Sequence, residues 1–206
     1  SQGKNMQDVL LRMRGQTDTA LADARSLGDV DAGLTEVLAT LSGLEAMRGQ
    51  IDKLAINNRE SGARFTDIIR KLIGYTHAVE RSVTDPTLAR ALSSLNQFIE
   101  MKERAGRERA MLGVVFNQDR FDADLLSTFS RNLGEFTAYS EGFRRNASPE
   151  FVSKLDEKMQ QPSGLEVARL QKLAFETPLG QPLGVKATDW FQTSTNRIDL
   201  MGEVEN

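Results

Sequence analysis

Apolar residues recur along most of the chain at steps of three and four, which is the spacing of one face of an α-helix. The clearest stretch covers residues 86–116, or roughly 45 Å of continuous helix. It begins at a strong start signal, because Asp85 can cap the helix and Pro86 fits its first position. No stretch shows a convincing alternation of apolar and polar residues, so β-strands are not expected.

The same periodicity predicts helices on both sides of this long segment. They cover roughly residues 4–27, 31–55, 61–75, 121–143, 148 onward, 162–175 and 186–206. Long helices with short connections pack as antiparallel bundles. The sequence therefore predicts an all-α fold, with two four-helix bundles that share the long helix over residues 86–116.

A basic residue interrupts the apolar stripe of that long helix. The stripe consists of Leu95, Phe98, Lys102, Ala105, Arg109, Leu112 and Phe116. Burying an unpaired guanidinium is costly, so Arg109 needs a partner. This partner is either a carboxylate of another helix, such as Asp18 or Asp52, or a small anion that fits the planar fork of the guanidinium. The spacing leaves both possibilities open.

Further basic residues lie on or beside apolar stripes, and together they indicate a polar pocket between helices. Each of them alone is more often a side chain that reaches solvent or forms a surface pair. Gly106 precedes Arg109 by one turn and leaves room for a helix or a small ligand to approach the backbone. The candidate binding residues are Arg109, Gly106, Lys102, Arg48, Arg14 and Thr17.

Composition excludes several classes of site. The chain of 206 residues has no cysteine and a single histidine, His77, which rules out disulfides, thiol nucleophiles and histidine-rich metal centres. A net charge of −3 does not favour binding to nucleic acid. Glu103 and Arg107 are spaced as a helix-stabilising pair, and no catalytic constellation is visible. We therefore expect a binding domain without metal or cofactor, and not an enzyme.

Three stretches of the sequence resemble one known family. The segment KERAGRERAMLGVVF contains its central motif, a lysine-glutamate pair followed by a glycine and a glutamate-arginine-alanine triplet. LLRMRGQTDTAL and WFQTSTNRIDLMGEVE are similar to two outer segments of the same family. On these motifs the chain resembles the nitrate- and nitrite-sensing (NIT) domains. The central motif is formed here by Lys102, Glu103, Gly106, Glu108, Arg109 and Ala110.

The resemblance implies an all-helical sensor of two four-helix bundles, in which Arg109 is a candidate contact to nitrate or nitrite. Members of the family are sensor modules of chemoreceptors, including methyl-accepting chemotaxis proteins, of histidine kinases, of cyclases and of antiterminators. Bacterial membrane-bound members hold the domain in the periplasm, between two membrane helices, and signal to a cytoplasmic output domain. The resemblance thus implies a periplasmic sensor that forms a homodimer, with a cytoplasmic location as the alternative.

One departure concerns the start of the chain. The family carries a glutamate-arginine-glycine motif in its first helix, whereas this sequence begins with SQGKNMQDVLLRMRG, which resembles the stretch just after that motif. We therefore expect the first helix of the family to be missing, with Arg14 as a possible substitute for its arginine. Residues 1–206 then form a single sensor domain of a larger signalling protein.

Two other interpretations remain at this point. In the first, the chain is a ligand-free helical dimerisation or scaffold domain in which Arg109 pairs with an internal carboxylate. In the second, the domain is a sensor whose ligand is another small carboxylate or an amino acid, because carboxylates also fit an arginine fork.

Overall fold

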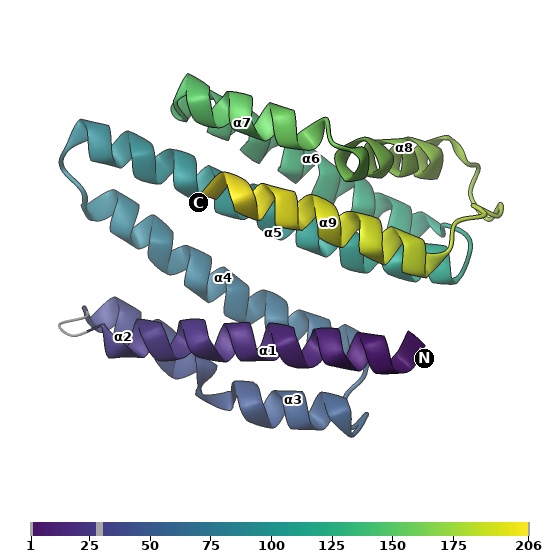
Figure 1. The fold of residues 1–206 in the computed structure, drawn as a ribbon, viewed down its shortest axis with the longest axis horizontal. Coiled ribbons are helices and arrows are strands. Elements are labelled where there is room, and N and C mark those ends of the chain that lie inside the picture. The colour runs from purple at the N-terminus through teal and green to yellow at the C-terminus, as the bar shows by residue number, and fades with distance from the viewer. Residues whose placement is uncertain (1, 28–30, 206) are drawn as a thin grey trace. The chain divides into compact units, whose positions relative to one another are not determined.

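The structure, a computed structural model, describes residues 2–27 and 31–205, without the side chains of residues 2–6 and 58. This part of the chain contains helices and no β-strand, which confirms the all-α prediction. Figure 1 shows the order of the helices along the chain. The chain divides into two compact units, residues 1–78 and 79–206, which are described separately below.

Helices of the first unit begin at polar capping residues. The side chain of Asp31 accepts a hydrogen bond from the Leu34 amide at 2.8 Å, and Asn57 accepts one from the Glu60 amide at 2.9 Å. Few apolar residues of this unit are buried, namely Leu44, Met47 and Ile73 among the described ones. The elements are α1 (Gln2–Ser26), α2 (Ala32–Thr40), the 3₁₀ turn η1 (Leu41–Gly43), α3 (Leu44–Asp52) and most of α4 (Asn58–Ser82).

The single helix predicted over residues 31–55 is wrong, because it is broken at Leu41–Gly43. The apolar stripe continues through the break, so periodicity did not reveal it. The break coincides with the adjacent Ser42 and Gly43, a pair at which helices often kink. The hydroxyls of Thr40 and Ser42 also bind backbone carbonyl oxygens within the preceding turn, at 2.7 and 2.8 Å.

The second unit is built on the long helix that the sequence predicted. Asp85 caps it through the Leu88 amide at 2.7 Å, with Pro86 in the first turn. This helix packs against α6 and α9, and α7 and α8 also contact α9. The elements are α5 (Pro86–Asn117), α6 (Ala123–Asn146), α7 (Pro149–Met159), α8 (Pro162–Glu176) and α9 (Ala187–Glu205).

The boundary between the two units lies inside α4, at residues 78 and 79. The helix that crosses this boundary is therefore α4, and not the helix over residues 86–116 that the sequence favoured as the shared element. All of α5 belongs to the second unit, where it is the central helix.

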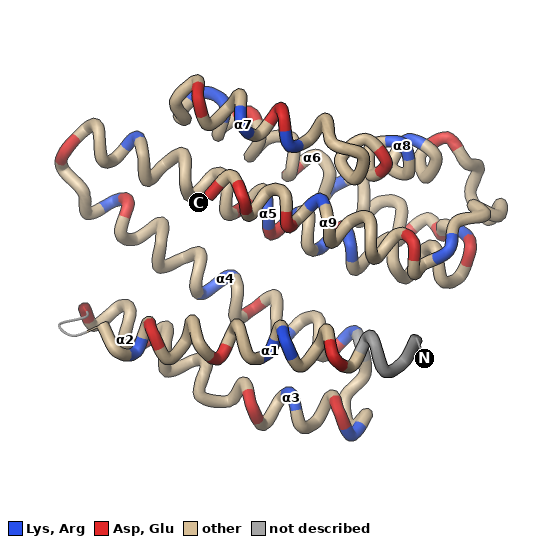
Figure 2. Tube along the Cα trace, in the orientation of Figure 1, with Lys and Arg blue, Asp and Glu red and all other residues tan. Residues whose placement is uncertain are grey.

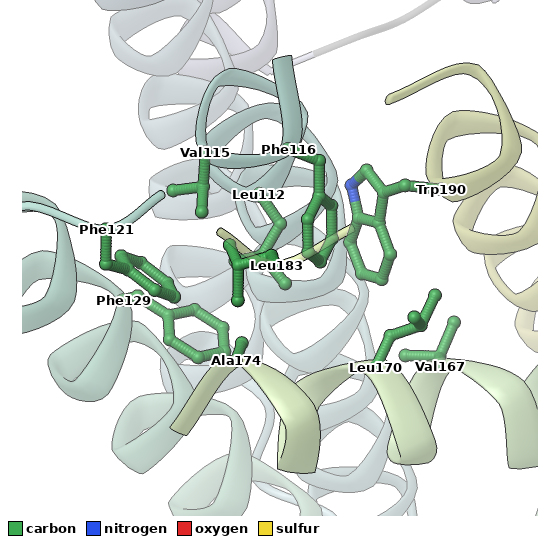
Figure 3. Close-up of a cluster of buried hydrophobic side chains, with 10 residues drawn as sticks. All are labelled: Leu112, Val115, Phe116, Phe121, Phe129, Val167, Leu170, Ala174, Leu183 and Trp190. Carbon is green, nitrogen blue, oxygen red and sulfur yellow. The ribbon is translucent and has the colours of Figure 1, made fainter. Parts of the chain in front are cut away.

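Two apolar clusters follow each other along α5. The larger one, shown in Figure 3, lies where α5, α6, α8 and α9 meet. It consists of Leu112, Val115, Phe116, Phe121, Phe129, Val167, Leu170, Ala174, Leu183 and Trp190. The second cluster uses earlier residues of α5 and consists of Phe98, Met101, Ala105, Phe143, Leu155, Met201 and Val204. The stretch of α5 between them carries Glu108 and Arg109 of the central motif.

We expect the substitution Leu112→Ala to destabilise the second unit by about 2–5 kcal/mol, because Leu112 is fully buried and a cavity would remain. Val114→Ala on the same helix is the matched control. Its side chain is 53% exposed, so its effect should stay within about 0.5 kcal/mol. Denaturant unfolding followed by the fluorescence of Trp190, the sole tryptophan, measures both. Equal losses in the two variants would contradict the assigned core.

Candidate functional site

Arg109 lies on α5 between the two apolar clusters, where α5 packs against α9. Its Nη1 donates a hydrogen bond to the hydroxyl oxygen of Thr195 at 3.0 Å. The centre of its guanidinium lies 5.1 Å from the centroid of the Phe191 ring. Phe191 and Thr195 are four residues apart on α9 and therefore share one face of that helix. Two helices thus hold the partly buried guanidinium in place.

A backbone contact fixes the same point of α5. The indole N–H of Trp190 donates to the carbonyl oxygen of Arg109 at 2.9 Å. Trp190 is fully buried and packs edge-on against Phe116, with ring centroids 5.5 Å apart. Because the contact joins the arginine's own backbone to α9, the position of Arg109 depends on the packing of the larger cluster.

The charge of Arg109 has no direct counterpart in the part of the chain that the structure describes. No carboxylate of the described residues lies within salt-bridge distance of it. Burial lowers the pKa of its guanidinium, and the Asp199 carboxylate acts weakly in the opposite direction. The Thr195 hydroxyl accepts the hydrogen bond from Arg109, so its own hydrogen remains available for another acceptor. Such an arrangement favours a small anion with several oxygens.

Asp18 and Asp52, the carboxylates that the sequence offered as partners of Arg109, have other partners within the first unit. In the first unit Asp52 accepts two hydrogen bonds from Arg14, at 2.7 and 2.8 Å, and Asp18 accepts one from Arg48 at 2.6 Å. Both carboxylates are thus engaged by other arginines.

These two pairs join α1 to α3 in a reciprocal arrangement. Arg14 and Asp18 are one turn apart on α1, and Arg48 and Asp52 are one turn apart on α3. Figure 2 shows acidic and basic positions on both helices. An open cavity of about 500 Å³ is lined by all four residues, with Gly15 and Gly49 beside them. Of the residues predicted to line a polar pocket, Arg14 and Arg48 lie here, whereas Arg109, Gly106, Lys102 and Thr17 do not line this cavity.

The remaining predicted residues do not gather around Arg109. The Thr17 hydroxyl donates to the Met13 carbonyl oxygen of its own helix at 3.0 Å, and Thr17 is exposed. Lys102 forms an ion pair with Glu205. A Cβ atom added at Gly106 would meet no atom of the described residues within 4 Å, so no helix packs closely against this side of its backbone. The space beside Gly106, one turn from Arg109, is open.

The sequence analysis missed the charged residues that are most buried. Arg104 is bound by Glu100 at 2.9 Å and by Glu135 at 2.6 Å. Glu108 is 1% exposed and pairs with Arg197 of α9 at 2.8 Å. A charged residue in an arginine-rich helix is normally expected to be exposed to solvent. The partners that make burial possible lie far away in the sequence, so periodicity does not reveal them.

The sequence did hold one signal for the surroundings of Arg109. Thr195 and Asp199 are one turn apart and therefore share a face of α9.

A model of the nitrate and nitrite sensing family matches residues 1–206, the whole sequence. The chain belongs to the nitrate- and nitrite-sensing family. This confirms the resemblance that the central motif indicated.

Two relatives of this nitrate- and nitrite-sensing domain agree with the assignment. A nitrate regulatory protein of Klebsiella oxytoca is 27% identical over 162 residues, which are 79% of this chain and 40% of that protein. The solved structure of the NasR transcription antiterminator matches with a TM-score of 0.76 and 26% identity, over 91% of this chain and 51% of that one. The chain thus spans about half the length of these relatives, or less.

In this nitrate- and nitrite-sensing domain, the Arg14–Asp52 pair makes stability depend on pH. The hydrogen bond from Arg14 is the main reason why the pKa of Asp52 lies below its ordinary value of 3.8. Because the folded-state pKa is lowered, the pair stabilises the fold above this ordinary value. This contribution is lost as the pH falls through the folded-state pKa.

We expect Arg14→Gln to raise the pKa of Asp52 toward its ordinary value. Asp156 is the control within the same molecule, because Arg144 lowers the pKa of its carboxyl in the same way and is not changed. An NMR titration of the carboxyl carbons measures both. An Asp52 pKa that Arg14→Gln leaves unchanged would show that the pair does not form in solution.

Proposed function

We propose that this domain senses nitrate or nitrite by binding the anion at Arg109, between α5 and α9. The observation that supports this proposal is the partly buried guanidinium, which has a hydroxyl and an aromatic ring beside it but no carboxylate partner among the described residues. An uncompensated cation away from water gains most from an anion. Family membership supports nitrate and nitrite as the anion class.

The chemistry of the two anions suits the groups present. Nitrate and nitrite are planar and offer two oxygens to the guanidinium nitrogens that do not bind Thr195. The Thr195 hydroxyl supplies a further donor, since it accepts from Arg109 and keeps its hydrogen free. The open space at Gly106, one turn away on α5, gives room for the ligand.

Arg14 and Arg48 also stay predicted ligand residues, but their surroundings favour an anion less than those of Arg109 do. Arg14 is followed by Gly15, so it shares two residues with the glutamate-arginine-glycine motif of the family. Both guanidinium groups already bind an aspartate, at 2.7 Å for Arg14 and 2.6 Å for Arg48. An anion at either residue has to displace that carboxylate, whereas Arg109 has no such partner among the described residues.

The ligand would act by joining two helices. An anion that contacts both Arg109 of α5 and Thr195 of α9 binds best when the two side chains are close. It therefore shifts the packing equilibrium toward that arrangement, by as much as its affinities for the two arrangements differ. We propose that α9 passes this shift to an output domain, since the chain covers only part of its relatives.

The cellular location of the sensor, its neighbouring domains and its oligomeric state are implied by the family resemblance alone. None of the described helices has the length and apolar character needed to cross a membrane. The periplasmic location, the flanking membrane helices, the chemoreceptor output and the homodimer stay predictions.

We expect Arg109→Ala to abolish the binding of nitrate while changing the free energy of unfolding by less than about 1 kcal/mol, because no buried carboxylate loses a partner. Calorimetric titration at constant ionic strength, with chloride as the balancing salt, measures binding. Arg107→Ala is the matched control, because Arg107 lies on the same helix, pairs with Glu103 and should leave nitrate binding unchanged.

Acetate in place of nitrate tests the carboxylate alternative. If Arg109→Ala instead destabilises the protein by several kcal/mol and the wild type binds neither anion, the ligand-free scaffold is the better account.

Gly106→Ala separates stability from ligand binding. The added Cβ meets nothing, so the better helix propensity of alanine should stabilise the protein by up to about 1 kcal/mol. Nitrate affinity should fall several-fold, because the methyl group occupies the open space one turn from Arg109. Gly113→Ala on the same helix also meets nothing and is the control that keeps full affinity. Equal nitrate affinity in both variants would exclude Gly106 from the site.

A further inference from the structure

A cavity of about 410 Å³ lies inside the second unit, apart from Arg109. Residues of α5, α6, α7, α8 and α9 line it. Its volume falls within the range of small-molecule sites, and its lining combines an apolar wall with a few polar groups, as such sites do. The polar groups are Thr137, Ser140, Gln160, Gln171, Arg144 and Arg197.

Arg197 is the most unusual side chain of this lining. It is 4% exposed, and only its Nη2 has a carboxylate partner, Glu108 at 2.8 Å. Its Nε is buried and has no hydrogen-bond partner, and its Nη1 binds no acceptor among the described residues. The ring of Phe136 lies 5.7 Å from the guanidinium centre but does not replace an oxygen acceptor. Nε itself has almost no accessible surface, so Nη1 is the nitrogen of this buried arginine that can donate to a ligand in the cavity.

The described lining of the cavity carries no uncompensated charge. Among the described residues, two charged side chains line it, and both are paired, Arg197 with Glu108 and Arg144 with Asp156. Gln171, which also lines the cavity, donates to the second oxygen of Glu108 at 2.6 Å. An anion would therefore enter a site without net charge and approach the Glu108 carboxylate. An uncharged ligand with an oxygen acceptor avoids this cost.

The apolar part of the lining suits a short, flexible chain. Three of its residues are methionines, Met101, Met159 and Met201. Methionine side chains are unbranched and polarisable, and they adapt to ligands of different shape. Phe136 and Leu155 add rigid apolar surface.

We propose that this cavity binds a small uncharged carbonyl compound, such as an amide or a lactone with a short alkyl chain. The carbonyl oxygen accepts a hydrogen bond from Arg197, and the alkyl chain lies against the methionines. Arg197 and Thr195 are two residues apart, or about 200° around α9, so they face different sides of this helix. The site is therefore distinct from the one at Arg109, although both contact α9.

The test uses the methionine methyl groups of the 206-residue protein as reporters. The methyl carbons are labelled, and hexanamide is titrated while NMR spectra are recorded. We expect saturable shifts at Met101, Met159 and Met201. Met47 of the first unit and Met111 of α5 do not line the cavity and should not shift. Shifts that do not saturate, or that are equally large at Met47 and Met111, would overturn the proposal.

Two further titrations establish the chemical class of the ligand. Hexanoate has the same chain with a charged head and should bind at least about tenfold more weakly than hexanamide. Sodium nitrate should leave the three cavity methionines unchanged. Hexanoate affinity equal to that of hexanamide, or nitrate shifts at these methionines, would show that the site selects for charge and would overturn the proposal.

Substitutions locate the binding site. Ala168 lines the cavity and is exposed on α8, so Ala168→Trp should fold and block the entrance. Lys172→Trp on the same helix, at a side chain 73% exposed and away from the cavity, should keep full affinity. Arg197→Lys keeps a charge opposite Glu108 but removes the unused nitrogens, and it should weaken binding about tenfold. Hexanamide binding that survives Ala168→Trp unchanged would overturn the proposal even if Arg197→Lys does not fold.

Discussion

The buried pair between Glu108 and Arg197 joins the central helix α5 to α9, with both side chains almost fully withdrawn from water. Removing one partner of such a pair typically costs about 3–5 kcal/mol, because the other charge stays buried alone. The pair therefore penalises any sliding of one helix along the other. It sets the alignment in which Trp190 reaches the Arg109 carbonyl oxygen and Thr195 reaches the guanidinium of Arg109. The candidate anion site depends on this alignment.

The arginines of the second unit show how the same group serves different purposes. Arg104 is surrounded by the carboxylates of Glu100 and Glu135, and Arg197 is matched by Glu108. The charges of these two arginines are neutralised by carboxylates within the protein, and their ion pairs stabilise the fold. Arg109 also lies between apolar clusters, but its neighbours are the Thr195 hydroxyl and the Phe191 ring. A cation that already has a carboxylate partner gains little free energy from an external anion. A site that responds to such an anion therefore needs a cation without a carboxylate partner.

Much of the fold could be predicted from local signals, and much of the site could not. The start of α5 at Asp85 and Pro86 depends on neighbouring residues only, so it was predicted correctly. The break at Leu41–Gly43 was missed because the apolar stripe continues through it. Arg109 stood out because it interrupts such a stripe. Its neighbour Thr195 and the burial of Glu108 depend on contacts between residues more than 80 positions apart, which periodicity does not encode.

We propose that Arg109 itself receives the anion. The most direct measurement follows the side-chain Nε–H signals of the arginines by NMR during a titration with nitrate, against chloride at equal ionic strength. The Arg109→Lys variant assigns the signal. The account predicts a saturable shift of the Arg109 signal that chloride does not reproduce. A stationary Arg109 signal, with saturable shifts at Arg14 or Arg48 instead, would contradict it and place the anion at the aspartate-paired arginines of the first unit.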